Sequence, residues 1–273
     1  MSDITVRKIR FDFPDSFDLG GSDEELASAL PSLALSLTMP YLEPYLIRTM
    51  KVAIDRITDP ELAEDTRHFS QQEGNHYRNH AVFNRTVRDH FGGTVAEELR
   101  GIEAALEADY QRFTREKSLR FSVAYAEGFE AMTCAGALAM AEHGMFDDSG
   151  GRMPGGELWA WHMAEEIEHR TVAFDVFEHL VGSYPVRIVL GTYSQWHYLS
   201  YIGRFAGCMA KALGRTLPRS RTPMQRAAVR NYLRTWSPFY HPAKLVVPGA
   251  VDLLLARYSA RAREALHTTG FGS

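Results

Sequence analysis

The chain has 273 residues, of which 45% are hydrophobic and 23% are charged, and its formal net charge at pH 7 is -4. This composition is typical of a soluble globular protein and excludes a disordered or fibrous chain. The small negative net charge gives no indication of nucleic-acid binding. We therefore expect one globular domain that spans residues 1–273 and has a substantial core.

Cysteine content and apolar stretches bear on the cellular compartment. The only cysteines are Cys134 and Cys208, too few for a disulfide framework. The first residues mix charged and aromatic side chains, whereas a secretory signal peptide has an apolar core. The most apolar stretch, residues 186–213, is interrupted by charged side chains, so no transmembrane segment is expected. Together these features favour a cytoplasmic protein.

Hydrophobic periodicity predicts helices along most of the chain and no strand. Pro31 and Pro40 suggest that the first long helix starts near Leu42, while Asp59 and Pro60 form a cap and first turn for the next. The segment 144–156 is rich in Gly and Asp and is expected to be a loop. Helices are expected at about residues 42–57, 60–90, 95–113, 117–143, 157–181, 186–213, 223–236 and 248–266.

These elements predict an all-α fold. Four of the helices are long enough to form a bundle about 30 Å in scale, since each residue adds about 1.5 Å. We assign the bundle to about residues 41–182 and treat the helices of about residues 185–266 as accessory elements.

Two Glu-x-x-His motifs carry the main chemical signal. Glu73 with His76 and Glu166 with His169 each place a carboxylate and an imidazole three residues apart, on one face of a helix. In carboxylate-bridged dimetal bundles, two such motifs are joined by one inward glutamate from each of two further helices. The pair therefore predicts a site for two metal ions inside the bundle.

Two further glutamates complete this pattern. Glu43 lies near the predicted start of the first helix, among residues that otherwise belong to a core. Glu130 lies in an apolar stretch, where a charge needs a partner. Glu127, one turn earlier, competes with Glu130, and we favour Glu130. Four carboxylates would balance the charge of two divalent ions.

Neighbouring residues extend the candidate site. His162 lies four residues before Glu166 on the same stripe of the helix and is a candidate third imidazole ligand. His80 lies seven residues after Glu73 and is expected either to bind metal or to orient a ligand. Near the ligands in sequence, the candidates for a supporting role are His80, Glu127, Glu165, Tyr77 and Tyr125.

Carboxylates with a few imidazoles suit iron or manganese, whereas structural zinc more often uses Cys and His. Two iron ions are the first expectation, and manganese or a mixed pair is the alternative.

At these residues the chain resembles a bacterial family of predicted metal-dependent hydrolases whose metal motifs look ferritin-like. The matching segments include residues 6–11, 43–48, 72–80, 129–133 and 164–175. The resemblance implies a ferritin-like four-helix bundle with additional C-terminal helices. The family usually has a histidine after the residue that corresponds to Glu130, whereas this chain has Ala131. Separately, His162 with Glu166 and His169 is similar to the ligand pattern of di-iron arylamine N-oxygenases.

The family description implies hydrolysis, which two close metal ions can support. An all-helical site of glutamates and histidines is, however, the usual setting of oxygen-activating di-iron proteins. We therefore expect an oxygenase or oxidase that uses O2 and a small organic substrate, with N-oxygenation as one candidate reaction. The alternatives are a dimetal hydrolase and a non-enzymatic metal-binding protein. An electron-donor protein and a homodimer are the expected partners.

Overall fold

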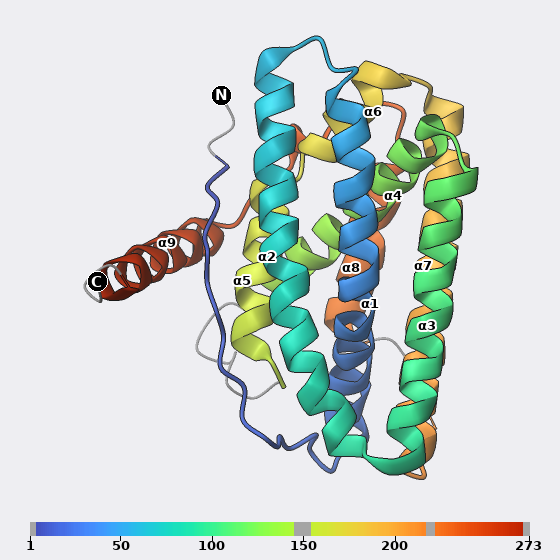
Figure 1. The fold of residues 1–273 in the computed structure, drawn as a ribbon, viewed down its shortest axis with the longest axis vertical. Helices are drawn as coiled ribbons and strands as arrows, with labels where there is room; N and C mark the ends of the chain where they lie inside the picture. Colours follow the sequence, from blue (N-terminus) through green and yellow to red (C-terminus); the bar gives the residue numbers. More distant parts are fainter. Residues whose placement is uncertain (1–3, 145–153, 217–221, 270–273) are drawn as a thin grey trace.

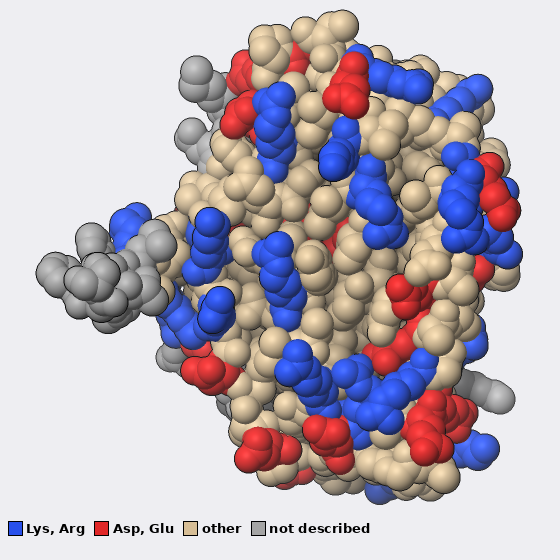
Figure 2. Space-filling view, in the orientation of Figure 1, with Lys and Arg blue, Asp and Glu red and all other residues tan. Residues whose placement is uncertain are grey.

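The computed structural model describes residues 4–144, 154–216 and 222–269, and nearly all of its regular structure is helical. No strand occurs in these ranges, which confirms the all-α prediction. The long helices run roughly side by side, and the last helix projects from the body of the molecule (Figure 1). On the face shown in Figure 2, basic and acidic side chains are interspersed. Within the described ranges, no helix has the length and apolar character that crossing a bilayer requires.

The first helix, α1 (Asp23–Ile54), begins much earlier than predicted. Its start is a capping box, in which the Ser22 hydroxyl accepts from the Glu25 N–H and the Glu25 carboxylate accepts from the Ser22 N–H. The prediction of a start near Leu42 was wrong, because Pro31 and Pro40 lie inside the helix rather than before it.

At Pro40, a side chain from the neighbouring helix replaces the missing helical hydrogen bond. Proline has no N–H, so the carbonyl of Ser36, four residues earlier, loses its usual helical donor. The Asn84 amide donates to this carbonyl at 2.8 Å from the neighbouring helix. A tertiary contact therefore satisfies the backbone where local sequence predicts a break.

The next three helices agree closely with the sequence prediction. They are α2 (Pro60–Phe91), α3 (Gly93–Glu116) and α4 (Leu119–Glu142). Asp59 caps α2 by accepting from the N–H groups of Glu61 and Leu62, and Gly92 ends it with a positive φ of 59°. The predicted loop at residues 144–156 lies mostly outside the described residues.

The predicted helix at 157–181 is instead two helices, α5 (Gly156–Glu168) and α6 (Val172–Leu180). The break follows the second Glu-x-x-His motif, because His169 is the C-cap of α5. The Arg170 side chain donates to the Ile167 carbonyl at 2.6 Å, which satisfies a carbonyl near the helix end. The apolar periodicity continues across this break, so the sequence pattern predicted one continuous helix.

The remaining elements are α7 (Tyr184–Ala212), α8 (Pro223–Thr235), a short 3₁₀ turn η2 (Pro242–Lys244) and α9 (Gly249–Thr269). Helix α7 packs against α1, α3 and α4, α8 packs against α4, and α9 packs against α5. The α4–α7 contact is close because Gly128 faces Gly191, and a Cβ at Gly128 would lie 2.3 Å from the Gly191 Cα.

An extended N-terminal segment, residues 4–21, runs along the outside of α2 (Figure 1). The Asn79 amide donates to the Ile9 carbonyl at 2.9 Å, and its oxygen accepts from the Phe11 N–H at 3.2 Å. One turn earlier, the Asn75 amide donates to the Arg7 carbonyl. This pairing brings the Arg7 side chain to α5 and α9, where it contacts Glu165 and Ser259.

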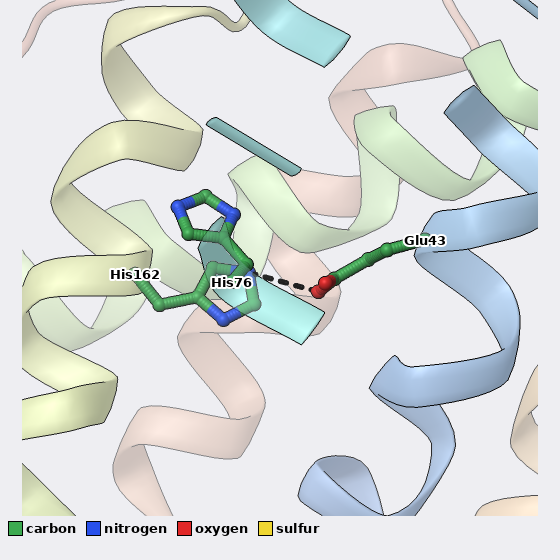
Figure 3. A group of neighbouring side chains, drawn as sticks. All are labelled: Glu43, His76 and His162. Atoms are coloured by element: carbon green, nitrogen blue, oxygen red, sulfur yellow. Dashed lines mark ion pairs between the residues drawn. The ribbon is translucent and has the colours of Figure 1, made fainter. Parts of the chain in front are cut away.

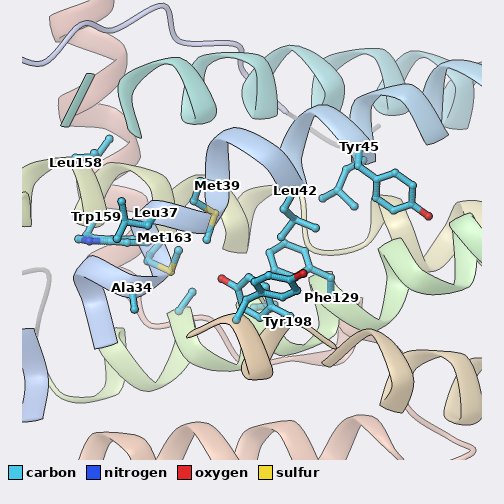
Figure 4. Packing of buried hydrophobic residues seen from close by; sticks show 14 of the residues in the cluster. Ala34, Leu37, Met39, Leu42, Tyr45, Phe129, Leu158, Trp159, Met163 and Tyr198 are labelled. Atoms are coloured by element: carbon cyan, nitrogen blue, oxygen red, sulfur yellow. The ribbon is translucent and has the colours of Figure 1, made fainter. Parts of the chain in front are cut away.

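The hydrophobic core fills the space between the long helices. Figure 4 shows Met39 and Leu42 of α1 near Phe129 of α4 and Tyr198 of α7. The Phe129 and Tyr198 rings meet edge to face with centroids 4.9 Å apart. These residues surround a group of buried polar side chains that the core would otherwise exclude.

Candidate metal centre

Seven buried polar side chains converge in the middle of the bundle. They come from α1, α2, α4, α5 and the C-cap of α5, and each is at most 4% exposed. Glu43 lies in the middle of α1 rather than near its start, so the helix dipole does not explain it. The group contains all the candidate ligands predicted from the sequence: Glu43, Glu73, His76, Glu130, His162, Glu166 and His169.

The side chains form three overlapping groups with suitable spacing for one ion each, and the third, Glu73 with His76 and Glu166, joins the other two. One group is Glu43, His76 and His162, whose ligand atoms all lie within 4.8 Å of one another. Figure 3 shows Glu43 reaching from α1 towards His162 and His76, and its carboxylate lies 3.6 Å from His162 Nε2. The His76 and His162 rings stack with centroids 4.1 Å apart.

The second group is Glu73, Glu130 and His169. The Nε2 atom of His169 lies 3.5 Å from Glu73 and 3.4 Å from Glu130. Glu166 lies between the two groups, since one of its oxygens is 3.0 Å from His162 Nε2 and 3.7 Å from His169 Nε2. Glu166 therefore lies near imidazoles of both groups.

Hydrogen bonds fix the orientation of the His162 ring. The Asn84 amide donates to the Ser36 carbonyl, so its oxygen accepts from the Ser36 hydroxyl at 2.6 Å. The Ser36 oxygen then accepts from His80 Nδ1 at 2.8 Å, and His80 Nε2 accepts from His162 Nδ1 at 2.8 Å. His162 Nδ1 is therefore held by His80, and its Nε2 faces the centre, 3.0 Å from a Glu166 oxygen.

The other two imidazoles are oriented in the same way. The Gln72 amide donates to Glu168 at 2.6 Å, so its oxygen accepts from His169 Nδ1 at 2.8 Å. The Glu165 carboxylate accepts from His76 Nε2 at 3.0 Å. Each histidine thus turns one nitrogen towards the centre and is held by an outer partner through the other, as metal-binding histidines are.

Several inward atoms have no hydrogen-bond partner among the described residues. They include both oxygens of Glu43 and Glu73 and one oxygen each of Glu130 and Glu166. His76 Nδ1 and His169 Nε2 are also unpaired. Leaving so many buried polar atoms unpaired is costly, and charged groups cost most. Bound cations would satisfy all of them, so the residues fit a metal centre.

Burial and the mutual repulsion of the glutamates shift the pKa values of the groups at the centre. Burial, and then the neighbouring Glu166 charge, raise the pKa of Glu73 to about 8. Burial and the nearby carboxylates hold the pKa values of Glu43 and Glu130 well above the ordinary value. Burial disfavours the charged form of His169, but the charges of the surrounding glutamates outweigh it and raise its pKa. Protons and metal ions therefore compete for the same atoms.

Aromatic rings surround the polar groups. Trp161 meets the His76 ring edge to face at 4.8 Å, and Trp159 stacks on His162 at 5.5 Å. The Phe69 ring lies 4.7 Å from the His169 ring. The walls of the centre are therefore largely apolar, and they separate it from solvent.

The remaining sequence candidates lie around the centre or away from it. His80 and Glu165 are the outer partners of His162 and His76. Glu127 is outside the centre and lies 3.5 Å from Arg187, which favours Glu130 as the inward glutamate of α4.

The two tyrosines proposed from the sequence lie in other surroundings. Tyr125 belongs to a separate cluster, where its hydroxyl bonds to Tyr110 and His197. Tyr77 is only partly buried and lies under the Arg78 guanidinium.

Sequence reasoning missed some of the supporting residues. Ser36 was not predicted, because hydroxyls are common in helices, and Gln72 entered only as the first residue of the family-like segment 72–80. Arg7 bonds to Glu165 at 3.0 Å and to Glu168 at 2.7 Å, and only the family-like segment 6–11 drew attention to it.

Comparison with known families places the chain in one of them. Residues 5–245 match the model of a family described as predicted metal-dependent hydrolase. The chain belongs to this family. The matched range includes every residue of the centre. It also extends to η2, beyond the segments that the sequence motifs cover. No curated protein and no solved structure matched the chain.

Proposed function

We propose that this protein binds two metal ions, with iron preferred over manganese, and uses them to activate O2 and oxidise a small organic substrate. One ion would be held by Glu43, His76 and His162, and the other by Glu73, Glu130 and His169. Glu166 would contact both ions, given its position between the groups. Glutamate and histidine donors suit both metals.

The apolar enclosure is the observation that favours oxidation over hydrolysis. A hydrolase must admit water, whereas every proposed ligand here is at most 4% exposed and the rings of Phe69, Trp159 and Trp161 cover the imidazoles. O2 is small and apolar, and it enters such surroundings more readily than a polar substrate. A dry site also keeps reactive species away from water.

When bound, reduced iron would pass electrons to O2. The residues around it would set its geometry: Glu165, His80 and Gln72 hold the three imidazoles with their lone pairs inward. Insertion of one oxygen atom, with release of the other as water, consumes two electrons and two protons. An electron-donor protein is the expected source of the electrons, and N-oxygenation of an amine is one reaction of this class.

Hydrolysis is the second candidate, because the family description names it. Two adjacent ions could activate a water molecule and stabilise a developing oxyanion. This reaction would need a route for water past the aromatic rings.

Metal content and oxygen uptake test the proposal. The purified protein should bind two iron ions per chain, measured by elemental analysis after anaerobic loading, and should consume O2 when a chemical reductant is supplied. The Glu73→Ala and Glu166→Ala variants should lose both ions. Glu127→Gln is the matched control, since Glu127 is a buried glutamate of the same bundle outside the centre.

Two results would overturn this function. One is a stoichiometry of one ion or none in wild type that is correctly folded by circular dichroism. The other is metal-dependent cleavage of esters or amides in anaerobic buffer, with no O2 uptake by the iron-loaded protein.

A further inference from the structure

A groove on the α4 and α8 side of the bundle has no role in the centre itself. Its cavity volume is about 450 Å³, which is within the range of small-molecule sites. The floor is a stripe of α4, and the walls come from α8 and the segment that follows η2. The α4 stripe runs along one helix face: Ala131, Ala135, Leu138 and Glu142.

The groove combines an apolar lining with unpaired positive charge. Leu245, Val246 and Pro248 form the apolar wall opposite α4. Two cations also line it, Arg234 and Lys244. No carboxylate within the described residues forms an ion pair with either of them, and Arg234 has only a 3.4 Å contact with the Asn231 amide oxygen.

The one carboxylate of the lining is already neutralised. Glu142 lies 2.8 Å from Arg230 and also accepts from the Asn231 amide at 3.2 Å. Within the described residues, no carboxylate of the groove therefore pairs with Arg234 or Lys244. These two positive charges lie beside a surface of small and apolar side chains.

The groove adjoins the segment of α4 that carries Glu130. Ala131 follows Glu130 directly, and Cys134, one turn further, is buried between α4 and its neighbours. Arg170, next to His169, donates to the Pro242 carbonyl at 3.2 Å and so fixes the groove wall to the break after α5.

We propose that this groove binds an amphipathic organic carboxylate, with the anion on Arg234 and Lys244 and the hydrocarbon part along the α4 stripe. This inference goes beyond the proposed function, since it assigns a second ligand site away from the centre. A carboxylate suits the guanidinium fork of Arg234 and the ammonium of Lys244. The small side chains Ala131 and Ala135 leave room for an alkyl or aryl group.

Calorimetric titration with decanoate, and with decanol as the neutral analogue, tests the inference. Decanoate should bind wild type both with and without metal, and decanol should bind about tenfold more weakly because it lacks the charge. The double variant Arg234→Gln with Lys244→Gln should bind decanoate no better than decanol. The charge-matched control is Lys51→Gln with Arg85→Gln, since both are exposed on α1 and α2, and it should bind as wild type.

A second variant keeps the test independent of folding. Val246 is 90% exposed, so Val246→Asp should leave the fold intact. The added negative charge should weaken the binding of decanoate more than the binding of decanol. The inference fails if wild type does not bind decanoate, or if the double variant binds it as tightly as wild type.

Measuring metal content and O2 uptake on the same preparations separates the two proposals. Failure of decanoate binding in a protein that takes up two ions and consumes O2 overturns the groove assignment alone. Decanoate binding in a protein that takes up no metal overturns the proposed function and leaves the groove as a carboxylate site.

Discussion

His76 Nε2 lies 3.0 Å from a carboxylate oxygen of Glu165, and this bond turns His76 Nδ1 towards Glu73. Arg7 in turn donates to the other Glu165 oxygen at 3.0 Å. The orientation of an inward imidazole on α2 therefore depends on a carboxylate of α5 and on a guanidinium near the start of the chain.

Glu165→Ala should weaken metal binding by about 10- to 100-fold, the usual effect of losing an outer partner of a metal-binding histidine. Arg7 keeps its bidentate contact with Glu168 in this variant, so the N-terminal segment should stay in place. Competition with a chelator would measure the affinity, with Glu127→Gln as the control. An unchanged affinity would show that Glu165 does not orient His76.

Asn84→Leu should destabilise the metal-free protein by about 1–3 kcal/mol, because the Ser36 carbonyl loses the amide donor that replaces the N–H that Pro40 lacks. Urea denaturation measures the change. Pro40→Ala restores a backbone donor, so it should recover part of the loss in the Asn84→Leu background. Equal effects of Pro40→Ala in both backgrounds would exclude this coupling.

Gly128→Ala should destabilise the protein by about 1–3 kcal/mol, because the added Cβ would lie 2.3 Å from the Gly191 Cα and force α4 and α7 apart. Gly136→Ala on the same helix is the matched control, since its Cβ would meet nothing within 4 Å. Helix propensity alone should make that control about 0.5–1 kcal/mol more stable. Thermal unfolding of both variants would compare them, and equal shifts would contradict the close contact.

Glu127 should make stability depend on pH. Burial raises its pKa from 4.5 to about 7, although Arg187 opposes the shift. The folded state therefore binds the proton more tightly, and this stabilisation is complete below about pH 4 and lost as pH rises through about 7. At about 1.36 kcal/mol per pKa unit, the loss is about 3 kcal/mol.

The Glu127→Gln variant lacks this titration and provides the comparison. Wild type should lose about 3 kcal/mol of unfolding free energy relative to Glu127→Gln between about pH 4 and pH 8, measured by urea denaturation without metal. A difference between the two proteins that does not change with pH would show that Glu127 keeps its ordinary pKa in the fold.

The sequence predicted elements whose signals are local. Helix α2 was placed well because Asp59, Pro60 and Gly92 mark its ends directly. The start of α1 was missed because the group that replaces the N–H of Pro40 belongs to Asn84, 48 residues away from Ser36. Three-residue spacing likewise brought Glu73 with His76 and Glu166 with His169 into the candidate site.

Other features depended on distant partners. Glu127 and Glu130 look alike in sequence, and what separates them is Arg187, 60 residues after Glu127. The break after Glu168 carries no proline or glycine, and Arg170 holds it through bonds to Ile167 and to Pro242 in a distant segment. Such contacts follow from packing, which periodicity alone does not describe.

We expect the position of α5 to set the order in which the protein assembles during translation. Three of the seven inward residues, His162, Glu166 and His169, belong to α5 and its C-cap. A nascent chain that ends after α4 holds Glu43, Glu73 and Glu130 with His76 alone, so those carboxylates cannot yet be buried at low cost. We expect ribosome-bound chains of this length to be digested rapidly by protease, with or without added iron, and chains that include α5 to become resistant. Closure of the bundle and acquisition of metal would then be one late event, completed after the last inward histidine has left the ribosome.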